Sequence, residues 1–436
     1  MEWYAAFLLL MGSFFALIVL GVPVVFAFFS VNIFFLWIFM GEAGLELMID
    51  SIYGSLSVFV LLPITLFILM GEVLFRSGIA MQMIDTLDKW LGRLPGRLAL
   101  LSVASGTLLA TLSGASIGTT AMLARTLSPA MEARGYKKTM SIGPLLGSGG
   151  LAIMIPPSAL GVILAVIASV SVGKLLIAII IPGMLLALSY VVYVIGACVM
   201  DPSLAPAYEV KRATLKEKLL LTLKYVLPLG IIIFLVTGVM FMGIATPTEA
   251  AALGTAGSFV LAICYRGMSA KILRDALFST LRISVMVLVI LAAAQAFTQL
   301  LAYTGSTRFL SQWASSLPIP GIWVIVAMHV VTLILGGPIG GIPLVMMTVP
   351  VFLPVVKALG YDPIWFCVAM LINVELAQIT PPFGVLLYVV KGIVPNTTMA
   401  EITRAAIPIV ICHLVVMGLV VAFPQLSLWL PGSMTK

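Results

Sequence analysis

The chain has 436 residues, of which 62% are hydrophobic and only 9% are charged, and its mean hydropathy is +1.23. This composition excludes a water-soluble catalytic domain and predicts an all-α polytopic membrane protein. The net charge of +7 is expected to report orientation in the membrane rather than a nucleic-acid partner.

Apolar runs predict ten membrane spans, together with two further segments. The spans lie near residues 5–20, 22–39, 53–75, 139–172, 175–200, 225–243, 249–265, 282–303, 364–392 and 405–430. If the acidic loop 40–52 faces outside, five loops that hold 19 of the 23 Lys and Arg residues fall inside. Because basic residues gather on the cytoplasmic side, both chain ends are expected outside the cytoplasm.

The segment 97–125 is too short for two full crossings. Arg125 follows Ser113 by 12 residues, which is roughly 18 Å of helix against about 30 Å of hydrocarbon. The chain must therefore turn back midway, within TLSGASIGTT at 111–120. We expect a re-entrant hairpin here, whose turn is tolerable only where protein buries it or where it lines a cavity.

An internal repeat divides the chain into halves 1–224 and 225–436. A shift of 225 aligns Pro129 with Pro354 and Pro156-Pro157 with Pro381-Pro382. Each half then contains five spans, one of which is a broken helix (139–172 and 364–392), together with a hairpin (about 97–125 and 319–357). Five crossings per half predict opposite insertion, which is typical of secondary transporters with sites near the midplane. Duplication in a structural membrane protein is the alternative, but it does not explain matched breaks.

Four polar islands interrupt the apolar chain at mid-membrane depth, at residues 111–120, 143–158, 336–341 and 373–383. Glycine and proline free backbone carbonyls there, and Ser, Thr and Asn add neutral oxygens, which suit Na⁺ better than a transition metal. The small hydroxyl residues could instead serve close helix packing, and the Pro-Pro pairs could be simple kinks.

Glu375 is the acid that lies deep in a predicted broken helix. In the repeat it aligns with Gly150, and Asn373 aligns with Ser148. An intramembrane acid is either a cation ligand, a proton carrier or a buried carboxyl satisfied by its neighbours. Other polar residues of the spans are expected to be structural. His329 and His413 are expected to be interior histidines, and the four cysteines are expected to be packing residues. Glu249 is expected to belong to a capping box, and Glu72 is expected to belong to an i,i+4 pair.

Several motifs resemble the large membrane subunit (DctM-type) of tripartite ATP-independent periplasmic (TRAP) transporters. They are GIATPTEAAA at 243–252, IPPS at 155–158, SVGKLLIAIIIPG at 171–183, VPVFLPVVKALGYDPIWF at 349–366 and ITPPFGVLLYVVKGI at 379–393. The resemblance implies Na⁺-coupled uptake of a small organic anion, such as a dicarboxylate or sialic acid, by an elevator-type movement in the bacterial inner membrane. It also implies two partners, a small four-helix membrane subunit (DctQ-type) and a periplasmic substrate-binding protein (DctP-type).

The same resemblance, together with the polar islands, places cations and substrate at the hairpin tips and unwound stretches. Family members often carry an acid near the second tip, where this chain has GGPIGG at 336–341. The candidate sodium and substrate residues are Ser113, Gly114, Ser116, Thr119, Gly147, Ser148, Gly149, Pro156, Pro157, Gly337, Gly340, Asn373, Glu375, Thr380, Pro381 and Pro382.

Other functions remain open at this stage. A self-sufficient ion-coupled carboxylate symporter would need no binding protein. An intramembrane enzyme is disfavoured, because the spans contain no paired aspartates, no Ser and His set and no HExxH. Matched hairpins argue against a passive channel. We expect no cofactor other than the coupling ion.

Overall fold

The computed structural model describes residues 2–92, 94–113, 116–206, 208 and 213–434, and the side chains of 110–113 and 338 lie outside that description. Helices make up the described chain, and no strand occurs within those ranges. The prediction of an all-α protein is therefore confirmed. Seven helical stretches of the described part are long and apolar enough to cross a membrane, and five shorter apolar helices accompany them.

The described residues of the first half build eleven α-helices and three 3₁₀-helical turns. Their bounds are α1 (Trp3–Val19), α2 (Val24–Met40), α3 (Glu42–Leu56), η1 (Phe59–Leu61), α4 (Leu62–Arg76), α5 (Ile79–Leu91), α6 (Arg97–Ser113), α7 (Ser116–Glu132), α8 (Lys138–Gly150), η2 (Leu151–Ile153), α9 (Ala159–Ile167), α10 (Val172–Ala178), α11 (Ile180–Met200) and η3 (Pro202–Leu204).

The second half follows a similar order of elements. It contains α12 (Leu215–Leu221), the π-helical turn η4 (Thr222–Val226), α13 (Leu227–Ile233), a second π-helical turn η5 (Phe234–Gly238), α14 (Val239–Phe241), α15 (Pro247–Cys264), α16 (Ala270–Tyr303), α17 (Ser306–Ser316), α18 (Gly321–Ile339), α19 (Gly341–Ala358), α20 (Pro363–Ile379), α21 (Val385–Ile393), α22 (Met399–Ala422) and α23 (Gln425–Gly432).

Residues 42–52, expected as a loop between two spans, belong instead to helix α3, so the expected loop is wrong, whereas their position outside the cytoplasm stays a prediction. Their three acids, Glu42, Glu46 and Asp50, are spaced by four residues and share one helix face, which leaves the other faces apolar. Gly44 lies so close to α2 that a Cβ there would meet the Leu36 carbonyl oxygen at 2.4 Å. The helix therefore packs on its neighbour rather than looping over it.

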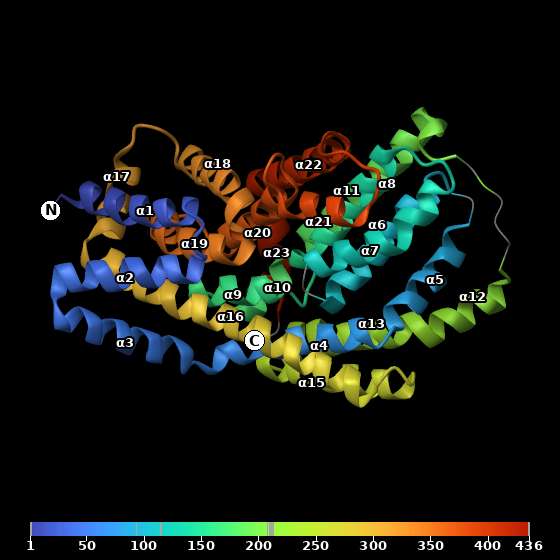
Figure 1. Cartoon of the computed structure of the whole chain (residues 1–436), viewed down its shortest axis with the longest axis horizontal. Coiled ribbons are helices and arrows are strands. Elements are labelled where there is room, and N and C mark those ends of the chain that lie inside the picture. The colour runs from blue at the N-terminus through green and yellow to red at the C-terminus, as the bar shows by residue number, and fades with distance from the viewer. Residues whose placement is uncertain (1, 93, 114–115, 207, 209–212, 435–436) are drawn as a thin grey trace.

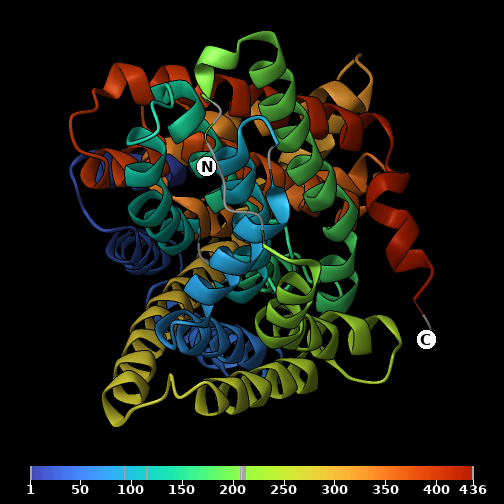
Figure 2. The same ribbon diagram turned by 90° about the vertical axis from the view of Figure 1, so that its right-hand side faces the viewer.

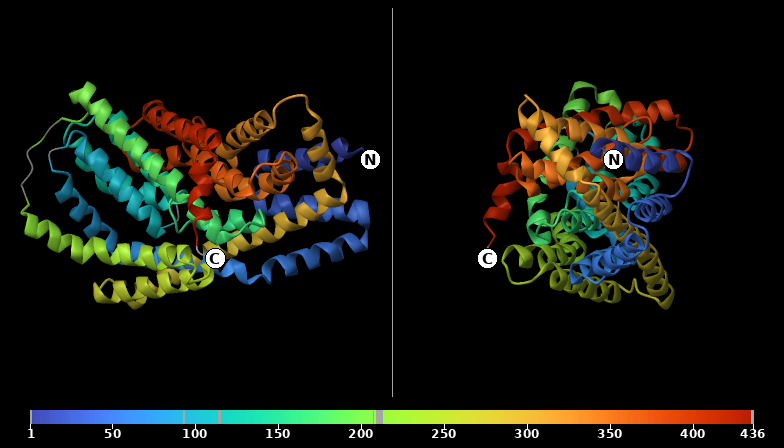
Figure 3. Two further views of the ribbon diagram at one scale, coloured as in Figure 1. Left: turned by 180° about the vertical axis from the view of Figure 1, so that it is seen from behind. Right: turned by 90° about the vertical axis from the view of Figure 1, so that its left-hand side faces the viewer.

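The helices fall into a scaffold and a body. In the scaffold, α4 packs on α15 and α16, and α16 also packs on α2 and α3. A buried polar contact helps to hold these long helices together, because Asn32 Nδ2 donates to the Ala293 carbonyl at 2.7 Å. The Thr255 hydroxyl of α15 shares its hydrogen between the Ala251 carbonyl of its own helix at 2.7 Å and the Leu66 carbonyl of α4 at 2.9 Å. Figure 1 shows the scaffold along the lower side of the molecule, below the other helices. Figures 2 and 3 show the same division from other directions.

The body contains two helix–turn–helix pairs at the segments predicted as hairpins. In the first pair α6 packs on α7, and residues 114–115 between them lie outside the described ranges. In the second pair α18 packs on α19, and the chain reverses at Gly340, whose φ of +83° favours glycine. Figure 1 shows the two pairs on either side of α20. Their depth in the membrane and the opposite insertion of the two halves stay predictions.

Two helices of the body are interrupted at the Pro-Pro pairs. The first interruption separates α8 and η2 from α9, and the second separates α20 from α21. Both Pro156-Pro157 and Pro381-Pro382 peptide bonds are cis. Because proline lacks an N–H and clashes with the preceding turn, a Pro-Pro pair accompanies each predicted break. Residues Gly147 to Gly149, which were expected to be unwound, are helical within α8, so that part of the prediction is wrong.

The acids predicted to be structural have that role. Thr246 and Glu249 form a complete capping box at the start of α15, with Pro247 in its first turn. Glu72 accepts a hydrogen bond from Arg76 Nε at 2.7 Å, one helical turn away. Both predictions are confirmed, and neither residue enters the candidate site.

Candidate functional site

The second hairpin tip lies against the second helix break. A Cβ on Gly336 would meet Ala377 Cβ at 2.5 Å, and a Cβ on Gly337 would meet Phe383 Cβ at 2.8 Å. A Cβ on Gly341 would lie 3.6 Å from Leu160 of α9, just after the first break. Gly336 and Gly337 therefore allow the tip to approach the second break more closely than side chains would permit, while Gly341 lies at ordinary contact distance from α9.

The first hairpin packs against the first broken helix in a similar way. A Cβ on Gly149 would lie 1.8 Å from Thr120 Oγ1, and one on Gly106 would lie 2.4 Å from Ser148 Cβ. Helix α7 also packs on η2 and on α21, which follows the second break. Segments of all four polar islands thus gather in one region of the body.

Two hydroxyl groups of α7 are buried in this region without a partner. Ser116 Oγ and Thr120 Oγ1 have no hydrogen-bond partner among the described residues, although both side chains are buried. Thr119, one turn into the same helix, is also buried. Gly114 and the side chain of Ser113 lie outside the described part of the chain. An unpaired buried hydroxyl is costly unless a ligand or water satisfies it.

N-terminal and C-terminal helix ends lie together at the hairpin tips and helix breaks. Four helices begin there (α7, α9, α19 and α21), and their N-terminal ends carry partial positive charge. Ser158 caps α9 by accepting from the Gly161 amide at 3.1 Å. Gly340 and Gly384, which precede α19 and α21, offer no side chain to cap their helices. Free amide groups at such ends suit an anion, and the facing C-terminal ends of α8, α18 and α20 suit a cation.

The two breaks differ in exposure. Pro156 and Pro157 are buried, whereas Pro382 is exposed, and the side chain of Phe383 beside it is 58% exposed. At the second break the Thr380 hydroxyl donates to the Leu376 carbonyl at 2.6 Å, and the Tyr388 hydroxyl donates to the Pro382 carbonyl at 3.1 Å. The second break is therefore the more exposed of the two in this structure.

Asn373 and Glu375 face opposite sides of α20, so they do not form one site. Asn373 Nδ2 donates to the His329 carbonyl of α18 at 2.7 Å, which holds the second hairpin to α20. Glu375 faces α8 and α22, and its Oε1 lies 2.2 Å from where a Cβ on Gly150 would be. Helix α20 runs unbroken to Ile379, so residues two apart point about 200° from each other.

Sequence reasoning missed the partners of Glu375. His413 Nε2 of α22 lies 3.4 Å from Glu375 Oε1, and the Tyr190 hydroxyl of α11 lies 3.2 Å from both ring nitrogens of His413. His413 stands alone in the sequence, and nothing in its neighbourhood indicates these contacts. The alignment of Gly150 with Glu375 was the available signal, because a glycine opposite an acid leaves room for its carboxyl group. Within the described residues, no three or more His, Cys, Asp or Glu side chains form a group that could hold a metal ion.

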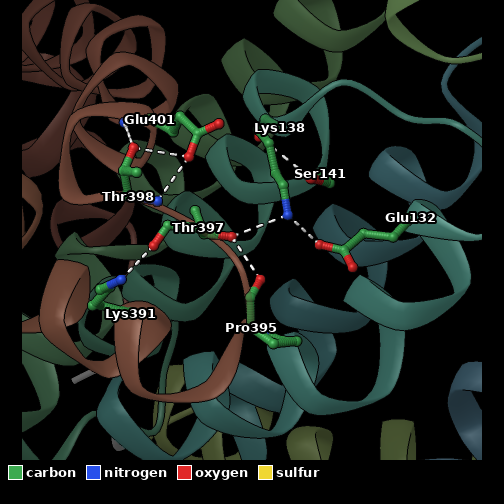
Figure 4. Close-up of polar contacts among 8 residues, drawn as sticks. All are labelled: Glu132, Lys138, Ser141, Lys391, Pro395, Thr397, Thr398 and Glu401. Carbon is green, nitrogen blue, oxygen red and sulfur yellow. Dashed lines mark hydrogen bonds and ion pairs between the residues drawn. The ribbon is translucent and has the colours of Figure 1, made fainter.

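A polar cluster ties the two halves together at one end of the body. Lys138, at the start of α8, pairs with Glu132 and donates to Thr397 Oγ1 at 3.0 Å, and Lys391 donates to the Thr397 carbonyl. Figure 4 shows Lys138 reaching between Glu132 and the loop that carries Thr397. Thr398 and Glu401 next to it form the capping box of α22. The cluster joins the end of the first hairpin to the loop after α21.

We expect Lys138→Met to lower the free energy of unfolding by about 1–2 kcal/mol, because it removes a partly buried ion pair and leaves buried Thr397 without its donor. Thermal unfolding of the purified chain in detergent measures the change. Lys137→Met is the matched control, since its pair with Asp201 is about half exposed and should contribute less than about 1 kcal/mol. Equal effects of the two substitutions would contradict the role of the cluster.

Comparison with known proteins identifies the family. The family model described as "Tripartite ATP-independent periplasmic transporter, DctM component" matches residues 11–426. The chain belongs to this family. As a DctM-type permease it is a multi-pass membrane transport protein, and its relatives are permeases rather than enzymes.

Individual relatives support the assignment along the whole chain. The C4-dicarboxylate TRAP transporter large permease protein DctM of Pseudomonas aeruginosa is 31% identical over 86% of each chain. The isethionate TRAP transporter permease protein DctMQ of Oleidesulfovibrio alaskensis is 27% identical over 97% of this chain and 66% of its own length. The YdaH transporter of Alcanivorax borkumensis shares the fold, with a TM-score of 0.63 over 88% of this chain and 90% of its own at 16% identity.

Proposed function

We propose that this DctM-type permease imports a small organic anion across the bacterial inner membrane. A sodium gradient drives the uptake, and a periplasmic binding protein supplies the anion. The observation that supports this proposal is that the two hairpins and the two interrupted helices meet in one region of the body. Uncapped helix N-termini after Gly340 and Gly384 would hold the carboxylate of the substrate, since the four islands contain no Lys or Arg.

The unpaired hydroxyls of the first hairpin support the sodium part of the proposal. Ser116 Oγ and Thr120 Oγ1 lie near the start of α7, and the carbonyl end of α6 precedes them. Neutral oxygens beside a negative helix end can replace the hydration shell of a cation at a depth where bare charge is costly. Around the second tip, the carbonyl ends of α18 and α20 would supply the equivalent oxygens near Gly337, Gly340 and Thr380.

Contacts between repeat-related positions support two inverted halves. Gly150 contacts Glu375, its counterpart at a shift of 225. Tyr190 contacts His413, and Cys412 Sγ lies 3.8 Å from the Ser189 carbonyl, so each of these pairs is separated by 223 residues, two short of that shift. Residues meet their own counterparts where two copies are related by a nearby two-fold axis. The hairpin-bearing body would then slide against the scaffold in an elevator-type movement.

A second membrane subunit is part of the proposal. The printed name DctMQ of one relative, of which this chain covers 66%, joins the large permease with a second component. We infer that this chain works with a small membrane subunit (DctQ-type), and that a soluble binding protein (DctP-type) delivers the substrate. A permease that transports free substrate alone remains the competing function.

Reconstitution tests the proposal. Proteoliposomes contain the chain and the small subunit, and a binding protein loaded with a radiolabelled carboxylate is added outside. We expect uptake only with an inward sodium gradient and with the binding protein present. Uptake of free substrate by the chain alone would favour the competing symporter, and uptake unaffected by replacing sodium with choline would refute sodium coupling.

A further inference from the structure

Glu375 is buried in the body, where His413 Nε2 lies 3.4 Å from its Oε1. Its side chain is 0% exposed, and neither carboxyl oxygen has a hydrogen-bond partner among the described residues. An ionised carboxylate in such surroundings would lose its hydration without receiving donors in return, which is among the most costly arrangements in a protein. The carboxyl group must therefore be neutralised by something that it binds.

The contacts of His413 indicate what neutralises it. His413 Nδ1 lies 3.0 Å from the Ile409 carbonyl, which only accepts hydrogen bonds, so Nδ1 carries a hydrogen. In the neutral ring this leaves the lone pair of Nε2, which lies 3.4 Å from Glu375 Oε1. Two acceptors face each other there. One proton between them, on Oε1 or on Nε2, makes the pair neutral overall.

Helix ends near the acid disfavour its charged form further. Glu375 lies in the last five residues of α20, and it touches Gly150, the last residue of α8. Both C-terminal ends carry partial negative charge, which repels a carboxylate. The contacts on its carboxyl group are an imidazole nitrogen and a glycine, whereas a hard cation prefers several oxygen ligands.

The other titratable groups near Glu375 and His413 do not supply the positive charge that this proton provides. The Tyr190 hydroxyl of α11 lies 3.2 Å from the His413 ring, and Cys412 lies beside Tyr190. Lys138, the basic residue of α8, is occupied with Glu132 at the far end of that helix. His329 of α18 lies against Asn373, on the opposite side of α20. None of these groups brings a positive charge to Glu375.

We infer that Glu375 and His413 form a proton-binding site, which holds one proton between Oε1 and Nε2 and is separate from the sodium and substrate positions. The proton keeps the contact between α8, α20 and α22 neutral and so lets the helices leading to both breaks pack together. Glu375 is thereby assigned to holding a proton instead of binding sodium. The inference rests on the pair's own geometry and does not depend on the proposed substrate or coupling ion.

Thermal unfolding at several pH values tests whether the folded protein binds this proton. In the unfolded chain above pH 7, a glutamic acid is ionised and a histidine is neutral, so the folded state binds one proton more. Between pH 7 and 9, the ratio of the wild-type unfolding equilibrium constant to that of Glu375→Gln should then rise about tenfold for each pH unit. Lys137→Met, which changes an exposed ion pair, should keep the wild-type slope. Equal slopes in the wild type and Glu375→Gln would overturn the inference.

Spectroscopy on the wild type tests the proton-binding site even if Glu375→Gln fails to fold. Infrared spectroscopy with labelled glutamate detects a protonated carboxyl group, and nitrogen NMR of labelled histidine detects a doubly protonated ring. One of these two signals is expected at pH 8. An ionised carboxylate beside a neutral imidazole would overturn the proton site. Neither measurement involves transport, so failure of the proposed function would appear separately, in the uptake of the wild type.

Discussion

Replacing Gly337 with alanine is expected to reduce uptake by about 5-fold to 150-fold while the chain still folds. The new Cβ would meet Phe383 Cβ at 2.8 Å, closer than side-chain atoms normally approach, so the second hairpin tip must move away from the second break. Overpacking of this kind costs about 1–3 kcal/mol. At about 1.4 kcal/mol per factor of ten, such a penalty on the state that binds substrate accounts for the loss.

The control for this substitution is Gly392→Ala in α21. Gly392 is a glycine in a neighbouring helix, but no atom lies within 4 Å of the position its Cβ would take. Alanine there should leave uptake unchanged and stabilise the helix slightly, because glycine is the poorer helix former. Initial uptake rates in proteoliposomes, corrected for the amount of folded protein, measure both variants. Wild-type rates in Gly337→Ala would show that close approach of the tip to the break is not required.

The sequence predicted those features that follow from length and composition. The first hairpin followed from the distance between Ser113 and Arg125, because twelve helical residues cannot cross the hydrocarbon. The breaks followed from Pro-Pro pairs at equivalent positions in the repeat. Helix α16 was predicted to begin at 282 but begins at Ala270, because its first three turns carry charged residues such as Lys271 and Arg274, which point outward and are exposed. Hydropathy marks the apolar part of a helix and misses its polar extension.

Features that depend on packing between distant segments could not be predicted in the same way. Asn373 and Glu375 were placed in one polar island, since the break was expected to include both. The structure keeps α20 helical to Ile379, and the two side chains therefore reach different neighbours. The contact of Glu375 with His413 depends on how α20 crosses α22, which no local pattern encodes. Sequence reasoning locates polar residues along the chain, but only packing decides which of them meet.

Replacing Ser116 with leucine is expected to abolish sodium-dependent uptake. Ser116 begins α7 at the first hairpin turn, and its hydroxyl is buried without a partner among the described residues. If that hydroxyl binds the coupling ion, leucine removes an oxygen and fills the space that the ion would occupy. Ser116→Ala removes the oxygen alone, and the loss of one buried polar contact, about 1–3 kcal/mol, should raise the sodium concentration for half-maximal uptake by about tenfold or more.

Ser102→Ala separates the effect of the oxygen from the effect of removing a buried serine. Ser102 is buried in the same hairpin, but its hydroxyl already donates to the Ala99 carbonyl at 2.7 Å within its own helix. Its substitution should leave the sodium dependence of uptake unchanged, whereas Ser116→Thr, which keeps an oxygen, should retain more uptake than Ser116→Ala. Identical sodium dependence in Ser116→Ala and the wild type would remove this hydroxyl from the ion site. The second tip, where glycine carbonyls rather than side-chain oxygens are available, would then be the remaining position for the coupling ion.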